Sequence, residues 1–317
     1  MLLTSQNTVF ADLIGQDPAV ELLTQAVKRD RVAPAYLFAG PDGVGRSLAA
    51  TCFLQLLTNS TLGRNHPDVL WVEPTYLHQG KRLTPAEAIA AGVKRKTPPL
   101  IRLEQVREIA QFLGRAPMQA SRSVVIIEQA EAMQEASANA LLKTLEEPGK
   151  ATLMLLAPSI DALLPTLVSR CQRIPFYRLN TAQMGQILER CGQAEILNYP
   201  EILQLAQGSP GAAIAHWQQL QTIPPELLTA LSNRPRTPRQ ALELGRQVDR
   251  ALELESQLWL VHYLQTIYWQ QALQQTDPSH TLSRTCLDAL EKAATSLRRN
   301  VQPRLVWEVT LLEIANS

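Results

Sequence analysis

Short apolar runs alternate with stretches of helical spacing over the first half of the chain, from about Val9 to Tyr177. The runs are continuous and rich in β-branched residues, which is typical of strands buried on both faces of a sheet. They are Tyr36–Phe38, Val69–Val72, Val124–Ile127 and Leu153–Leu156. Strands that alternate with helices in this way predict an α/β fold with a parallel sheet covered by helices.

Beyond Arg178 the strand signals stop, and helical spacing continues between breaks that are rich in glycine and proline. We therefore expect an all-helical carboxyl-terminal half. It holds four of the five tryptophans, which at helical spacing are expected in a core or an interface. These are Trp217, Trp259, Trp269 and Trp307.

Regular spacing fades between residues 73 and 101, where turn formers and positive charges gather. The segment contains Gln79-Gly80 and the basic run Lys94–Lys96. We interpret it as a surface insertion.

Length and composition fit a folded protein of two or three domains, with 317 residues, of which 45% are hydrophobic and 19% charged. No apolar run approaches the roughly 20 residues that cross a bilayer, and the first residues do not resemble a signal peptide. We expect a cytoplasmic protein with no membrane partner. A formal net charge of +1 means that any contact with nucleic acid needs a local basic face.

A glycine-rich segment follows the first predicted strand: Gly40-Pro41-Asp42-Gly43-Val44-Gly45-Arg46-Ser47. It fits the phosphate-binding pattern G-x-x-x-x-G-K-[ST] at every fixed position except the lysine. Gly40, Gly43 and Gly45 let backbone N–H groups wrap a phosphate chain, and Ser47 can ligate magnesium. Arg46 keeps the charge of the missing lysine but changes its geometry, so catalysis should suffer more than binding. The alternative is a turn that binds nothing.

Glu128 and Gln129 follow the predicted strand Val124–Ile127, where an ATPase needs two acids, one near magnesium and one near the attacking water. Glu128 is one methylene longer than the expected aspartate. Gln129 is an amide and cannot act as a carboxylate base. Bound ATP should therefore turn over poorly. A Glu128 that merely caps the following helix is the alternative.

The segment Val124–Pro148 and the motif Ser169-Arg170-Cys171 closely resemble clamp-loader subunits of the AAA+ family. Phe10–Gln16 and Ala35–Gly40 extend this resemblance over roughly the first two thirds of the chain. Within the family, the chain resembles the delta-prime type of bacterial DNA polymerase III, which keeps the serine-arginine-cysteine motif while its own ATP site has lost key groups.

The same segment also shows a helical pattern. Apolar residues recur at helical spacing at Met133, Ala136, Ala140, Leu141 and Leu145. We therefore expect a helix between Gln134 and Glu147 that packs its apolar side on the sheet until Pro148-Gly149 ends it.

The resemblance implies a role for Arg170, with Ser169 and Cys171 as its motif. The arginine should reach the γ-phosphate of ATP on the neighbouring motor subunit and stabilise charge there, as a finger delivered in trans. The alternative is a surface arginine that pairs with a nearby acid. Cys171 has no histidine partner evident in the sequence, so we expect a packed thiol rather than a nucleophile.

The chain departs from the family pattern at three further places. Pro158 and Ser159 follow the strand Leu153–Leu156, where relatives carry a polar phosphate sensor, and Gly211 stands at the place of a lid arginine. Cys52 is alone in the region where many relatives bind zinc with four cysteines, so no zinc or other metal site is expected. No cofactor is required, while residual binding of ATP or ADP with magnesium stays open.

The resemblance further implies three parts: a RecA-like AAA+ domain over residues 1–179, a helical lid over 180–213 and an all-helical collar over 214–317. It implies a chain without ATPase activity that joins motor subunits and a delta subunit in a five-subunit ring. The ring places the sliding clamp on primer–template DNA as part of the DNA polymerase III holoenzyme, in which this chain is not the polymerase. Candidate DNA contacts are Arg102, Arg107 and Arg122, with solvated surface arginines as the alternative.

Two other functions stay open. The chain could be an active motor ATPase that tolerates Arg46, Glu128 and Gln129. It could also be a stand-alone P-loop kinase or nucleotide sensor, although the long helical tail and the serine-arginine-cysteine motif speak against this.

Overall fold

The computed structural model describes residues 9–93, 97–147, 149–274 and 280–316. These form two compact units, Met1–Met184 and Gly185–Ser317. The division does not test the predicted boundary between a lid and a collar, which stays a prediction. Among the described residues, no helix is long and apolar enough to cross a membrane.

The first unit is built on a five-stranded parallel sheet with the order β2-β5-β6-β1-β7. Its strands are β1 (Ala35–Ala39), β2 (Val69–Val72), β5 (Ser123–Ile127), β6 (Ala151–Ala157) and β7 (Gln172–Pro175). The four predicted strands and the parallel α/β fold are confirmed. The sequence did not predict β7, because it lies at an edge of the sheet and two of its four residues are exposed and polar.

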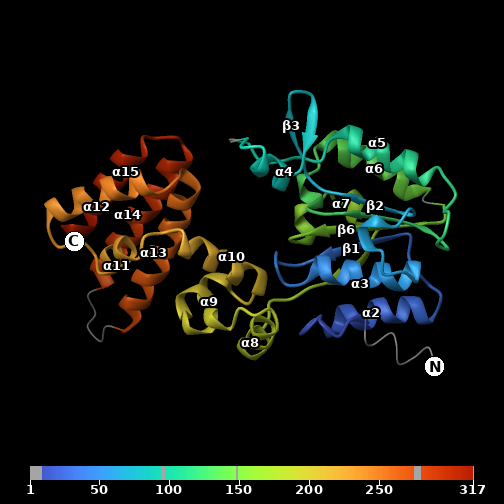
Figure 1. Ribbon diagram of the computed structural model, residues 1–317, viewed down its shortest axis with the longest axis horizontal. Helices are drawn as coiled ribbons and strands as arrows, with labels where there is room; N and C mark the ends of the chain where they lie inside the picture. Colours follow the sequence, from blue (N-terminus) through green and yellow to red (C-terminus); the bar gives the residue numbers. More distant parts are fainter. Residues whose placement is uncertain (1–8, 94–96, 148, 275–279, 317) are drawn as a thin grey trace. The chain divides into compact units, whose positions relative to one another are not determined.

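Helices cover both faces of this sheet, α2 and α3 on one face and α5, α6 and α7 on the other (Figure 1). Their bounds are α2 (Asp17–Lys28), α3 (Arg46–Thr58), α5 (Leu103–Leu113), α6 (Glu135–Glu146) and α7 (Pro165–Val168). Because strand side chains alternate between faces, Phe38 packs in the α2/α3 core and Leu37 in the other. In the first core, the rings of Tyr36 and Phe53 meet edge to face, with centroids 5.1 Å apart.

Helix α6 confirms the predicted helix between Gln134 and Glu147, but its buried face differs in part from the prediction. Ser137, Ala138, Leu141 and Leu145 are buried, whereas Ala136 is exposed. Ala136 was wrongly placed on the apolar face, because the sheet contacts the side of the helix defined by the spacing from Ala138 to Leu145. Pro148, predicted to end the helix, lies outside the described residues.

The segment from 73 to 101, predicted as a surface insertion, folds in part into regular structure. A hairpin of β3 (Tyr76–His78) and β4 (Lys81–Leu83) is followed by the short helix α4 (Pro85–Ala90). Gln79 and Gly80 have φ values of +48° and +77°, which suits a two-residue hairpin turn. The basic run Lys94–Lys96 lies outside the described residues.

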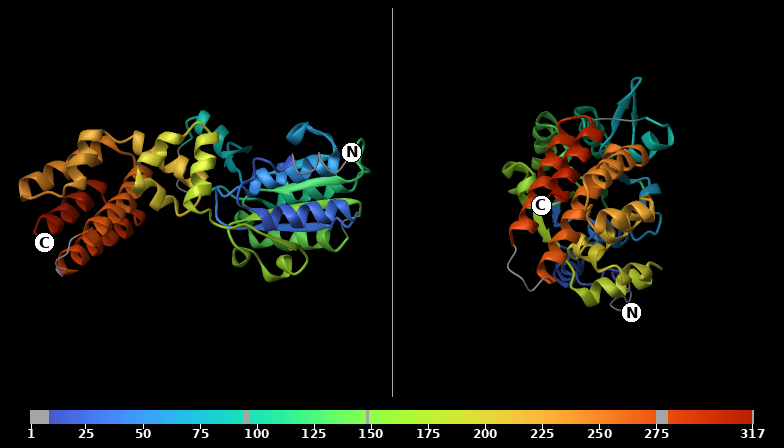
Figure 2. Two further views of the ribbon diagram at one scale, coloured as in Figure 1. Left: turned by 90° about the horizontal axis from the view of Figure 1, so that it is seen from below. Right: turned by 90° about the vertical axis from the view of Figure 1, so that its left-hand side faces the viewer.

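The second unit is helical, as predicted. Its α-helices are α8 (Thr181–Arg190, which begins in the first unit), α9 (Pro200–Ala206), α10 (Pro210–Gln221), α11 (Pro225–Ser232), α12 (Pro238–Ala251), α13 (Leu254–Gln274), α14 (His280–Arg298) and α15 (Pro303–Ala315). Helix α12 packs along α15, and α13 along α14 (Figure 2). Trp217 and Trp307 are buried as expected, whereas the side chain of Trp269 is 49% exposed.

Candidate functional site

The glycine-rich loop connects the end of β1 to the start of α3, the setting that the sequence predicted. Gly45 has a φ of +108°, a backbone conformation that L side chains rarely adopt. A Cβ atom at Gly40 would collide with the backbone carbonyl of Phe176. The loop is further fixed by the fully buried Gln16, whose Nε2 donates to the carbonyls of Val44 (3.2 Å) and Tyr177 (2.8 Å).

Arg46, which replaces the lysine of the phosphate loop, turns back onto its own loop. Its Nη2 donates to Oδ1 of Asp42, and its side chain is only 9% exposed. Among the described residues, its Nη1 atom is buried and has no hydrogen-bond partner. Buried polar groups normally have hydrogen-bond partners, so an unpaired guanidinium nitrogen favours a loop that takes an anion over a turn that binds nothing. The loop therefore keeps one group that suits a phosphate oxygen.

Glu131 is a residue near this loop that sequence reasoning missed. Burial raises the pKa of its carboxyl group, the Arg46 guanidinium opposes that rise, and Asp42 adds to it. Arg46 therefore has two acids of its own chain near it, Asp42 and Glu131. No motif marks Glu131, because it lies in the single 3-10 turn Ala130–Ala132, which is too short to show a spacing pattern.

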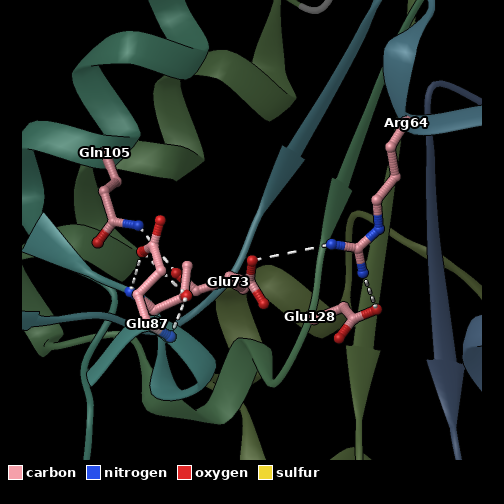
Figure 3. Close-up of polar contacts among 6 residues, drawn as sticks. Arg64, Glu73, Glu87, Gln105 and Glu128 are labelled. Atoms are coloured by element: carbon pink, nitrogen blue, oxygen red, sulfur yellow. Dashed lines mark hydrogen bonds and ion pairs between the residues drawn. The ribbon is translucent and has the colours of Figure 1, made fainter. Parts of the chain in front are cut away.

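Glu128 follows β5 as predicted, but a cation of the same chain already pairs with it. Nη2 of Arg64 lies 3.3 Å from Oε1 of Glu128, and Nη1 lies 3.8 Å from Oε1 of Glu73 (Figure 3). The predicted alternative, a Glu128 that caps the next helix, has no support, because no side chain caps the helical turn Ala130–Ala132. A magnesium ion would need oxygen ligands at the place that a guanidinium faces, so these residues do not fit it.

The other residues that depart from the ATPase pattern lie in loops or at the start of a helix. Pro158 and Ser159 follow β6, and Ser159 is exposed and makes no capping hydrogen bond. Gln129 is exposed, with a φ of +48°. Gly211 is the second residue of α10 in the second unit. None of these positions offers a charged side chain to a phosphate.

Arg170 lies in the short connection between the end of α7 and the start of β7. Its Nη1 donates to the carbonyl of Thr166 at 3.0 Å, and its Nη2 donates to Oε1 of Glu146 at 2.7 Å. Ser169 donates from Oγ to the same carbonyl of Thr166, also at 3.0 Å. In the chain by itself Arg170 thus pairs with an acid, as the alternative reading of this residue expected.

Arg170 and the phosphate loop lie at opposite ends of the strands. Arg170 is at the amino-terminal edge of the sheet, where β7 begins, and the loop is at the carboxyl-terminal edge, where β1 ends. Strands β1 and β7 are parallel and pair from Tyr36 with Gln172 to Ala39 with Pro175. Arg170 precedes the start of this pairing, whereas Gly40 follows its end. At about 3.3 Å per residue, the two positions are separated by roughly 10 Å or more of strand. Arg170 is therefore too far away to contact a phosphate held by the loop of its own chain.

Cys171 is a packed thiol, as predicted. It is partly buried against the core that contains Leu167 and Val168, and burial raises its pKa to about 11. A protonated thiol is a poor nucleophile at neutral pH. The remaining cysteines, Cys52, Cys191 and Cys286, form no disulfide bond, and Cys191 is exposed.

The rate of alkylation should distinguish the exposed thiol from the packed one. At pH 8 we expect iodoacetamide to label Cys191 quickly and Cys171 slowly, because roughly one Cys171 thiol in a thousand is ionised at that pH. Its labelling rate should rise about tenfold per pH unit up to pH 10. Peptide mass spectrometry over a time course measures both rates, and fast labelling of Cys171 in the folded chain at pH 8 would contradict this account.

The three arginines considered for DNA contact do not form one patch. Arg107 is exposed on α5. Arg122 precedes β5 and donates to Oγ1 of the buried Thr152 at 3.1 Å, which is a structural contact at the amino-terminal edge of the sheet. Arg102 lies near the other edge, since its neighbour Ile101 pairs with Met133 just beyond β5. A role in DNA contact stays a prediction for each of them.

No group of three His, Cys, Asp or Glu side chains in the described part of the chain is placed to hold a metal ion.

Two family models match the chain. The model described as DNA polymerase III, delta subunit, matches residues 15–180, which is just over half of the sequence. The model described as cyanobacterial DNA polymerase III delta prime, C-terminal domain, matches residues 182–314. Together the two models cover both units of the structure.

Individual relatives and one solved structure agree with these models. The delta-prime subunit of DNA polymerase III from Pseudomonas aeruginosa is 32% identical over 60% of this chain and 57% of its own length. The tau subunit from Bacillus subtilis is 28% identical over 61% of this chain, which spans only 33% of that protein. A gamma subunit-related protein from Thermotoga maritima has the same fold, with a TM-score of 0.58, 18% identity and coverage of 93% and 98% of the two chains.

Proposed function

Because the chain belongs to the family of DNA polymerase III delta-type subunits, we propose that it is a non-motor, delta-prime-type subunit of a clamp loader. In this proposal Arg170 completes the ATP site of a neighbouring subunit. The observation that carries it is the placement of Arg170 at the sheet edge opposite to the phosphate loop of its own chain.

The state of that phosphate loop supports the non-motor part of the proposal. Arg46 pairs with Asp42, Glu128 pairs with Arg64, and Gln129 cannot accept a proton from water. By this pattern an ATPase needs a bound metal ion and a carboxylate base for the attacking water. Glu128 already pairs with Arg64 and Gln129 carries no carboxylate, so these two residues supply neither. The chain is therefore not expected to hydrolyse ATP.

The surroundings of Arg170 support the trans-acting part. Its side chain is 38% exposed, and that of its partner Glu146 is 53% exposed. An exposed ion pair contributes about 0.2–1 kcal/mol, so a phosphate on a neighbouring chain can replace Glu146 at a small free-energy cost. A guanidinium has the planar fork and permanent charge that suit the developing charge of a transferring phosphoryl group.

The proposal implies a set of partners. Motor subunits would hold the ATP, a delta subunit would complete a five-subunit ring, and the helical second unit would supply collar contacts between subunits. The ring would act on a sliding clamp and primer–template DNA as part of the DNA polymerase III holoenzyme. The tau and gamma names among the relatives fit such an assembly of related chains.

The test of the non-motor role is the replacement Arg46→Ala. We expect the isolated chain to show no ATP turnover above that of its Arg46→Ala variant, because Gln129 is no carboxylate base and Glu128 already pairs with Arg64. In a reconstituted loader with clamp and DNA, Arg46→Ala should leave total ATP turnover within about twofold of the wild type.

The replacement Arg46→Lys is the matched control. It restores the phosphate-loop pattern without restoring a base at Gln129, so the isolated chain should remain inactive. Turnover by the isolated wild-type chain that Arg46→Ala abolishes would mean that the chain is a motor ATPase. An isolated chain that does not join the loader subunits would favour a stand-alone nucleotide sensor.

A further inference from the structure

A cation of the chain itself lies between two carboxylates at the carboxyl-terminal edge of the sheet. Strands β2 and β5 pair in parallel up to Val72 and Ile127, so the residues that follow them, Glu73 and Glu128, come out side by side. Two adjacent carboxylates repel each other unless a cation joins them. Arg64 is that cation, and each of its two terminal nitrogens faces one of the acids (Figure 3).

The position of Arg64 is set by its surroundings. It belongs to the short 3-10 helix Gly63–Asn65, which packs against β2. Its guanidinium carbon lies 4.2 Å from the centroid of the Trp71 ring, a cation–π distance. Trp71 packs against the core that also contains Val69, so the surface on which the guanidinium rests is fixed.

The acids are held as well. The backbone carbonyl of Glu73 accepts a hydrogen bond of 2.9 Å from Nε2 of Gln105, and Oε1 of Gln105 accepts one of 3.1 Å from Oγ1 of Thr75. Gln105 is 6% exposed. The backbone N–H of Glu128 donates to the carbonyl of Val72 at 2.9 Å. Both carboxylates thus start from fixed backbone, and Arg64 reaches both.

We propose that Arg64 is a built-in counter-ion that takes the place of a divalent cation at the carboxyl-terminal ends of β2 and β5 and keeps magnesium away from Glu128. A guanidinium carries its positive charge on a planar fork, which can face two carboxylates at once. Magnesium also requires close oxygen ligands in octahedral geometry, which Glu128 cannot offer while it pairs with Arg64. Any polyphosphate in the loop would then meet Arg46, the backbone N–H groups and the exposed Ser47, without a metal ion held by Glu128. This proposal goes beyond the proposed function and does not depend on the role of Arg170.

Binding of Mn²⁺ alone, followed by electron paramagnetic resonance on the full chain, tests the proposal. The wild type should bind Mn²⁺ weakly. The replacement Arg64→Gln should tighten binding at least about tenfold, because it leaves Glu73 and Glu128 as a pair of oxygen ligands without a counter-ion. Adding Glu128→Gln to that variant should remove the gain.

Two further variants separate the charge of Arg64 from other effects. Arg64→Lys keeps the positive charge and should bind Mn²⁺ as weakly as the wild type. Arg82→Gln breaks another exposed pair, in which Nη2 of Arg82 lies 2.6 Å from Oε1 of Glu108, and should not change Mn²⁺ binding. The proposal is overturned if the wild type binds Mn²⁺ as tightly as Arg64→Gln, or if Arg64→Gln gains nothing while its unfolding transition stays intact.

Discussion

In the proposed loader, ATP hydrolysis at the neighbouring site that Arg170 would complete is expected to fall on the order of 10³-fold when Arg170 is replaced by alanine. The guanidinium would meet charge that develops on the γ-phosphate, and alanine leaves that charge uncompensated. The other ATP sites of the proposed ring would keep the arginines of their own neighbours, so total ATP turnover should fall only by the contribution of this site. Phosphate release by the reconstituted loader, stimulated by clamp and DNA, measures the loss.

Glu146→Ala is the matched control for this experiment. It removes the same ion pair from the isolated chain but keeps the guanidinium of Arg170. Since such an exposed pair contributes about 0.2–1 kcal/mol, turnover should stay within about fivefold of the wild type. Arg170→Lys should fall between the two, because it keeps the charge and loses the planar fork. Wild-type turnover in the Arg170→Ala loader would end the trans-acting proposal.

The second large effect is expected on stability, from the replacement Asp68→Ala. Asp68 is 3% exposed, and its carboxylate accepts backbone hydrogen bonds from Met118 (2.6 Å), Gln119 (2.7 Å) and Ala120 (2.7 Å). Alanine would leave three N–H groups without their acceptor, at a cost of about 2–4 kcal/mol in the free energy of unfolding. Urea unfolding of the full chain, followed by circular dichroism, measures this change.

The same carboxylate should make stability depend on acid pH. Burial acts to raise the pKa of Asp68, but the backbone hydrogen bonds and nearby His66 outweigh it, so the pKa lies below its usual value. A pKa that is lower in the folded state contributes stability above the unfolded value of about 3.9, and this contribution is lost as the pH falls through the folded value. The difference in the free energy of unfolding between wild type and Asp68→Asn should therefore be constant from pH 5 to 8 and shrink below about pH 4.

The exposed Asp161 provides the control for both measurements. Asp161→Ala should change the free energy of unfolding by less than about 0.5 kcal/mol. An equal loss from Asp161→Ala and Asp68→Ala, or a difference between wild type and Asp68→Asn that grows towards acid pH, would show that the hydrogen bonds of Asp68 are not the cause.

Much of the fold could be predicted because buried strands consist of apolar residues without interruption. Val124–Ile127 lies inside the sheet and is fully buried, so its apolar run is unbroken. Gln172–Pro175 pairs on one side only and keeps polar residues, so the same reasoning missed it. Ala136 was misplaced for a related reason: a small apolar residue fits an exposed helix position as well as a buried one.

The candidate site divides in the same way. The phosphate loop and the motif at Arg170 are local in sequence, so spacing alone revealed them. Arg64 is separated from Glu128 by 64 positions, and a single arginine in a short 3-10 helix carries no pattern. Its partner could be found only once parallel pairing had brought Glu73 and Glu128 together. Glu146 likewise is separated from Arg170 by 24 positions. It lies in a helix whose apolar spacing predicts how the helix packs but does not predict a partner for an exposed acid.

The opposite placement of Arg170 and the phosphate loop gives the chain a direction. One edge of the sheet can donate a group to a neighbour, and the other edge can receive one. In the proposed ring, such chains would associate head to tail, through two different surfaces, and not face to face through one shared surface. Arg46 and Glu128 of this chain already pair with Asp42 and Arg64, so an arginine donated to its own loop would meet no working ATP site. The series of working ATP sites around the ring would therefore end at this chain, which would fix the order of the other subunits.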